Sequence, residues 1–162
     1  MFRTINDFLD RWNDETESTV KIFSALTDES LRQAMPGGRS AGRLANHLIE
    51  SLSEFPNKLG LPIYEEPAAY TTVAELVEAY RQRAETVKNA VQFEWTDETL
   101  ELEANMYGET WKNGLALWIL LAHQTHHRAQ ITTLMRFAGL KVPGVYGPSR
   151  EEWMSLQMQP LE

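Results

Sequence analysis

The chain has 162 residues, 43% of them hydrophobic, which is enough to bury a core, and we expect one domain over residues 1–162. Its 15 basic and 23 acidic side chains give a net charge of -8, which argues against nucleic acid and anionic membranes as partners. The absence of cysteine excludes disulfides, thiolate metal ligands and a cysteine nucleophile, and it suits a cytoplasmic location.

The first half of the chain predicts two long helices. Apolar residues recur at helical spacing from about Thr4 to Leu26, and a short turn over residues 28–35 then stops at a Pro-Gly-Gly sequence. Ser40 is a good N-cap for a second helix that runs to about Lys58. Pro56 lies inside this stretch and favours a kink or an early end.

The second half predicts two more helices. One begins at Thr71 or Thr72, with Glu75 placed for a capping box, and continues to about residue 93. Residues 99–111 allow a short hairpin that turns at Gly108, although a reading without strands stays open. The last long helix is expected to be capped by Thr110 and to end near residue 138, followed by a short turn at residues 149–156. The predicted fold is an all-α four-helix bundle.

The sequence HQTHHRAQ near the end of the chain places three of the four histidines within five residues. His123 and His127 are four residues apart, so on a helix they lie on the same face, and that face is the apolar stripe. His126 is turned by about 100° from His127 and is not expected to join them. The remaining histidine, His47, lies on the predicted inner face of its own helix. The candidate metal ligands are therefore His47, His123 and His127, which give three protein ligands from two helices.

Two other interpretations of this pattern are possible. A histidine on an apolar face is often a buried, neutral imidazole that is hydrogen-bonded to the protein, although burying three without partners is unfavourable by roughly 1–3 kcal/mol each. The spacing also resembles the HExxH sequence of zinc proteases, whose glutamate acts as general base. Gln124 stands at that place and cannot accept a proton from water, which argues against a protease.

Carboxylates, aromatic rings and one arginine near this group have less certain roles. Glu50 is the first candidate for a catalytic base or fourth ligand and Glu54 the second, because both lie within about 60° of His47 on the helix. Either can equally be a solvent-facing side chain. Three aromatic residues are candidates for a pocket lining or for the core: Trp12, Tyr80 and Trp118. Arg128 either meets an anionic ligand or pairs with a carboxylate on a neighbouring helix.

The segments RLANHLIES (residues 43–51) and LAHQTHHRAQITTLMRFAGLKVPG (residues 121–144) resemble the DinB/YfiT-like superfamily of metal-dependent proteins. The resemblance covers essentially the whole chain, with Ala129 where the family usually has glycine. It implies a bundle with up-down-down-up connectivity and a divalent metal, such as Zn, Ni or Fe, held by His47, His123 and His127. It also implies a homodimer and transfer of a low-molecular-weight thiol such as bacillithiol.

The function expected from residues and resemblance together is transfer of a thiol to an electrophilic small molecule. The sulfur nucleophile would come from a cofactor, because the chain has no cysteine. Two alternatives need the same ligands: a hydrolase that uses metal-bound water, and a non-enzymatic bundle that binds a metal or a small ligand.

Overall fold

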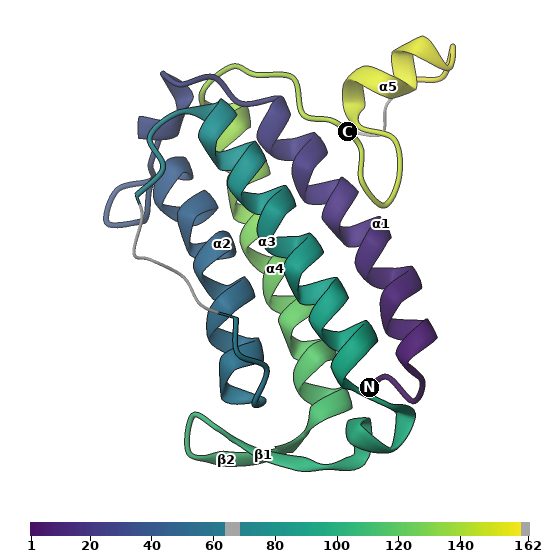
Figure 1. Ribbon diagram of the computed structural model, residues 1–162. Coiled ribbons are helices and arrows are strands. Elements are labelled where there is room, and N and C mark those ends of the chain that lie inside the picture. Colours follow the sequence, from purple (N-terminus) through teal and green to yellow (C-terminus); the bar gives the residue numbers. More distant parts are fainter. Residues whose placement is uncertain (64–68, 160–162) are drawn as a thin grey trace.

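The computed structural model describes residues 1–63 and 69–159 of the chain. Within them lie five α-helices: α1 (Ile5–Ser24), α2 (Ala41–Lys58), α3 (Val73–Glu94), α4 (Asn113–Phe137) and the short α5 (Arg150–Ser155). The described residues also form two 3₁₀ helices, η1 (Ser30–Arg32) and η2 (Asp97–Glu101). Two strands, β1 (Glu103–Met106) and β2 (Glu109–Lys112), lie between η2 and α4. The four long helices pack side by side as a bundle (Figure 1), which confirms the predicted fold class.

The direction of the helices follows the up-down-down-up pattern. Helices α1 and α4 run one way, whereas α2 and α3 run the other (Figure 1). Helix α2 packs against α4 and α1 packs against α3, and the Trp12 indole donates a hydrogen bond of 2.9 Å to the Ala84 carbonyl across the second pair.

Helix starts follow local capping chemistry. The side chains of Thr4, Ser40 and Thr72 accept hydrogen bonds from the backbone three residues later, which satisfies amides that the first helical turn leaves free. Thr72 and Glu75 form the predicted capping box. Helix α2 continues through Pro56 to Lys58, so this proline lies in the last turn and does not end the helix early.

Helix α4 begins later than the sequence predicts. Thr110 was expected to cap it, but Thr110 lies in β2, opposite Asn105, and the helix starts at Asn113 after Lys112. The hairpin itself is confirmed. Its turn residues Tyr107 and Gly108 have φ values of 58° and 91°, the conformation of a tight turn that matches the twist of the strands. The ladder hydrogen bonds keep Thr110 extended, so it cannot act as a cap.

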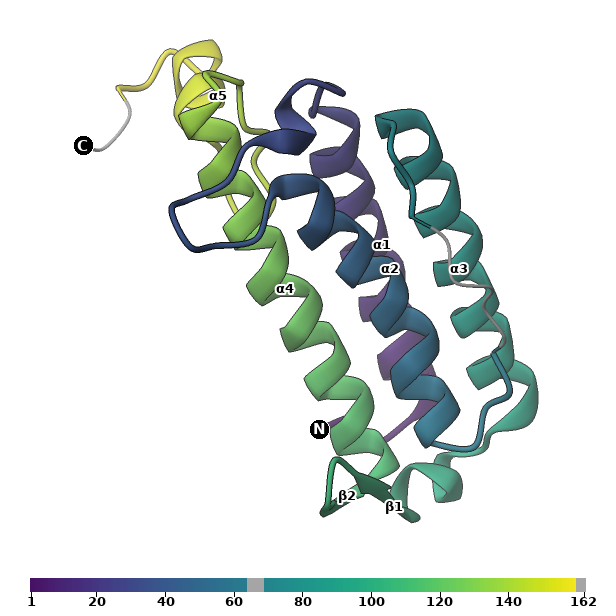
Figure 2. The same cartoon turned by 90° about the vertical axis from the view of Figure 1, so that its left-hand side faces the viewer.

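The hairpin crosses the end of the bundle where α2 ends and α4 begins (Figure 2). At the opposite end, the segment after α4 turns at Gly139, whose φ of 72° fits the predicted helix stop. None of the described helices combines the length and the apolar character that crossing a lipid bilayer requires.

Candidate metal centre

Three histidines from two helices meet between α2 and α4. His47 comes from the middle of α2, and His123 and His127 lie one turn apart on the facing side of α4. The centre of the His47 ring lies 4.9 Å from that of His123 and 4.7 Å from that of His127. The ring centres of His123 and His127 are 4.5 Å apart. One ring nitrogen from each residue lies within 4.8 Å of the other two. The structure therefore brings together the three residues that the sequence selected as ligands.

The surroundings keep these imidazoles neutral. Burial is the main cause of the lowered pKa of each ring, and together with neighbouring charges it lowers the pKa of His123 to about 4. The nearby guanidinium of Arg39 lowers all three further. A neutral imidazole has a free lone pair, so the triad is in the protonation state that metal binding needs.

The arrangement of the ring nitrogens fits a divalent ion. The Nε2 atoms of His47 and His123 lie 3.2 Å apart. This distance is close to the value of about 3.3 Å for two nitrogens bound to one tetrahedral zinc ion, each at about 2.0–2.1 Å. A cation between these lone pairs would interact favourably with all three rings. The donor set of three imidazoles suits zinc, nickel and iron alike.

Comparisons with known proteins agree with this fold. The sequence model of the DinB family matches residues 1–161. The chain belongs to the DinB family. The uncharacterized protein YrdA of Bacillus subtilis (strain 168) is 36% identical over 163 residues, which cover 98% of each chain.

Solved structures of other DinB-like proteins show the same fold. One from Bacillus cereus ATCC 10987 superposes with a TM-score of 0.84 and 41% identity, covering 90% of this chain and 100% of that one. A second, YjoA from Bacillus subtilis, has a TM-score of 0.62 and 20% identity over 87% of this chain and 95% of that one. The second match supports the fold alone.

In this DinB family member, the side chains of Gln130 and Glu50 contact the Nδ1 atoms of His127 and His47, respectively. The Gln130 carbonyl lies 2.7 Å from Nδ1 of His127, and its amide nitrogen lies 3.2 Å from Nε2 of His126. Because the amide nitrogen can only donate, the carbonyl oxygen accepts a proton from His127 Nδ1, which leaves Nε2 of that ring free. The side chain of Gln130 is exposed and lies at the rim of the triad.

Glu50, the predicted catalytic carboxylate, lies beside the triad. Its carboxylate is 3.7 Å from Nδ1 of His47 and accepts hydrogen bonds of 2.9 and 3.0 Å from Arg43. This contact holds the outer side of His47 and leaves its Nε2 facing His123. Glu54 lies further along α2, where it accepts a hydrogen bond of 2.9 Å from the hydroxyl of Tyr107 in the hairpin.

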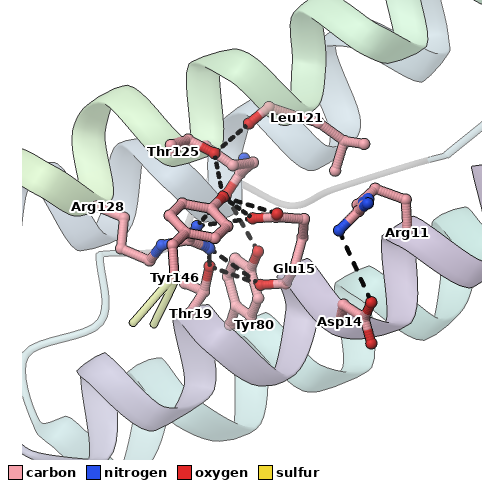
Figure 3. A network of polar contacts seen from close by, with 10 residues as sticks. Arg11, Asp14, Glu15, Thr19, Tyr80, Leu121, Thr125, Arg128 and Tyr146 are labelled. Carbon is pink, nitrogen blue, oxygen red and sulfur yellow. Dashed lines mark hydrogen bonds and ion pairs between the residues drawn. The ribbon is translucent and has the colours of Figure 1, made fainter. Parts of the chain in front are cut away.

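Gln124 and Arg128 point away from the metal centre. Gln124 is buried and contacts Tyr80, Ser51 and the carbonyl of Leu48, so it joins α2, α3 and α4. Arg128 forms a buried ion pair of 2.7 Å with Glu15 of α1. Figure 3 shows this pair with the hydroxyl of Tyr146, which donates to Glu15 from the chain after α4. Arg128 therefore pairs with a neighbouring helix, one of the two roles that the sequence left open.

The three candidate pocket aromatics do not line the triad. Trp12 and Tyr80 are core residues, with 2% and 1% of their surface exposed. Trp118 is 49% exposed and borders a groove between α1 and α4. The aromatic ring next to the triad is that of Phe55, 5.7 Å from the ring of His123. Its position eight residues after His47 on the same helical face was the signal that could have found it.

A cavity of about 430 Å³ opens beside His127 and Gln130, between α4 and the loop before α2. Arg39, from that loop, lines it. Sequence reasoning did not single out Arg39, because neither its type nor its spacing from His47 indicates a site. Its place after Pro36-Gly37-Gly38, directly before the helix that carries His47, was the available signal.

Proposed function

We propose that this protein is a metal-dependent enzyme that transfers a low-molecular-weight thiol to an electrophilic small molecule. The observation that carries the proposal is the convergence of three neutral imidazoles next to a cavity whose described lining residues include no carboxylate. His47, His123 and His127 would hold the metal. When bound, a divalent ion such as Zn, Ni or Fe supplies the positive charge that lowers the pKa of a thiol or of water.

The lining of the cavity favours a thiol over water as the nucleophile. Attack by water is helped by a base placed within hydrogen-bonding reach. Among the described residues, Glu50 is the carboxylate that contacts the triad, and it is engaged by Arg43. A thiol has a pKa of about 8.5 and needs less help to ionise. Since the chain has no cysteine, the sulfur would come from a cofactor such as bacillithiol.

Metal analysis and turnover assays test this function. Protein purified without a histidine tag is expected to contain a divalent metal, and His123→Ala to lose it. The metal-loaded protein should conjugate bacillithiol, mycothiol or glutathione to an electrophile such as 1-chloro-2,4-dinitrobenzene, above the rate of His127→Ala. Less than about 0.2 metal per chain, in wild type and His123→Ala alike, would contradict the site.

The assays also separate the two alternatives. Ester hydrolysis without any thiol, lost in His127→Ala, would indicate a hydrolase. Tight metal binding with neither reaction would indicate a bundle that binds a metal or small ligand without turnover.

We further propose a cytoplasmic homodimer that acts on small molecules and binds neither nucleic acid nor membranes. The net charge of -8 supports the last two points, and the absence of cysteine supports the cytoplasmic location. Two exposed apolar side chains of α4 support the dimer: Trp118 and Phe137 are 49% and 60% exposed. Light scattering should give twice the chain mass, and Trp118→Glu should halve it. A monomeric mass that does not change as the protein concentration is raised would contradict the dimer.

A further inference from the structure

The cavity beside the triad combines one cation with apolar surface. Arg39 lines it together with Met35 and Leu44, while His127 and Gln130 form the side next to the metal centre. Among the residues that the structure describes, no aspartate or glutamate lines it. A ligand in this cavity therefore meets the triad at one side, a guanidinium at another and carbon atoms between them.

Arg39 differs from the other arginines near the triad. Arg43 is paired with Glu50, and Arg128 is paired with Glu15. Arg39 is exposed and forms no ion pair or hydrogen bond with the part of the chain that the structure describes. Its donors are therefore available to a ligand.

The charge balance of the site calls for an anion. Three neutral imidazoles would leave the double charge of a bound metal uncompensated, and Arg39 adds a further positive charge close enough to affect all three rings. Glu50 is the carboxylate in contact with the triad, and Arg43 already neutralises it. A guanidinium that lacks a protein partner is well suited to bind a carboxylate through two parallel hydrogen bonds.

We propose that Arg39 binds a carboxylate of the thiol cofactor and selects acidic thiols over neutral ones. This inference rests on the proposed thiol transfer and names the chemical class of the cofactor. Sulfur approaches the triad while the carboxylate binds Arg39, and the carbon chain between them lies along Met35 and Leu44. Arg39 is a specificity residue and takes no part in bond making.

Calorimetric titration of zinc-loaded protein tests the proposal without measuring turnover. The probes are mercaptosuccinate, which has two carboxylates, and 2-mercaptoethanol, which has none. The proteins are wild type, Arg39→Ala, Arg39→Lys and the control Arg32→Ala, which removes one exposed arginine outside the cavity. Zinc content is measured for each, so that loss of the ion is not mistaken for loss of the anion site.

Wild type is expected to bind mercaptosuccinate about fivefold more tightly than 2-mercaptoethanol, the upper end of the effect of one exposed ion pair. Arg39→Ala should lose this preference, Arg39→Lys should keep part of it and Arg32→Ala all of it. If Arg39→Ala keeps the preference, or wild type has none, Arg39 has no such role while thiol binding stands. If zinc-loaded wild type binds neither thiol, the proposed function fails and this inference with it.

Discussion

At the scale of single residues, the triad depends on the groups that hold its outer nitrogens. Nδ1 of His127 is fixed by Gln130 at 2.7 Å, and Nδ1 of His47 faces Glu50 at 3.7 Å. Nδ1 of His123 is buried with no hydrogen-bond partner among the described residues. Such contacts select the tautomer and orient the ring toward a metal. The three rings are therefore held unequally.

Replacing Gln130 by leucine should weaken zinc binding by about tenfold, the lower end of the effect of such contacts. The reason is that His127 loses the acceptor that keeps its proton on Nδ1 and its Nε2 free. Competition with a chromophoric chelator measures the affinity. Gln130→Glu should retain most of the affinity because it keeps an acceptor oxygen, and Gln92→Leu, at an exposed position of α3, is the matched control. Equal affinity of Gln130→Leu and wild type would show that this contact does not orient the ring.

The lowered pKa of His123 predicts how the metal-free protein responds to acid. The folded state keeps this pKa at about 4, whereas an unfolded histidine has about 6.5. Between these values the unfolded state binds more protons, so stability is present above pH 6.5 and is lost as the pH falls toward 4.

The melting temperature of the metal-free protein should therefore fall from pH 6.5 to pH 5, a range in which most carboxylates stay ionised. The fall should be smaller in His123→Gln, which has no group to protonate at this position. A melting temperature that is flat over this range, or equal slopes for the two proteins, would show that burial of His123 does not control it.

At the scale of elements, the start of α4 is set by its neighbours. Gly114 lies in the first turn, and its carbonyl accepts a hydrogen bond of 3.2 Å from the amide of Phe2. A Cβ atom there would lie 2.5 Å from the carbonyl oxygen of Phe2 and 3.3 Å from that of Leu100. Both are backbone atoms, which yield less easily than side chains. The glycine thus lets the N-terminal segment and η2 approach the helix closely.

Gly114→Ala is expected to lower the free energy of unfolding by about 1–3 kcal/mol, the usual effect of overpacking. The clash should outweigh the higher helix propensity of alanine. Urea denaturation measures the loss. Gly147→Ala serves as control, because no atom lies within 4 Å of a Cβ built there, and its change should stay within about 0.5 kcal/mol. A stabilised Gly114→Ala would mean that the N-terminal segment moves aside freely.

At the scale of the whole molecule, one buried ion pair joins the helices on either side of the core. The side chains of Arg128 and Glu15 are 3% and 8% exposed. Arg128 also donates to Thr19 at 3.1 Å, and Tyr146 brings the segment after α4 to the same group (Figure 3). A buried charge left without its partner is strongly unfavourable, whereas removing both charges together is not.

Glu15→Leu should therefore lower the free energy of unfolding by about 3–5 kcal/mol, because it leaves Arg128 unpaired in the interior. The double variant Glu15→Leu/Arg128→Met should recover most of this loss. Its zinc affinity should equal that of wild type, since Arg128 points away from the triad. Chemical denaturation and the chelator competition measure the two properties. Equal losses in the single and double variants would show that the ion pair itself supplies the stability.

Much of this bundle could be predicted from local sequence. The cap at Ser40 and the capping box at Thr72 depend on atoms within a few residues, so the starts of α2 and α3 follow from the sequence. The spacing of His123 and His127 likewise places both on one helical face. Thr110 was misassigned as a cap because strand pairing with Asn105, a contact between two segments, fixes its backbone.

The sequence by itself determined the helical periodicity, the lack of cysteine and the choice of three inward histidines. Only the tertiary structure decided that His47 meets His123, which is 76 residues away, at 3.2 Å. It also decided that Arg128 is paired with α1 while Arg39 stays available beside the triad. The physical reason is that helix caps and faces depend on short-range geometry, whereas the partner of a charge depends on which helices pack together.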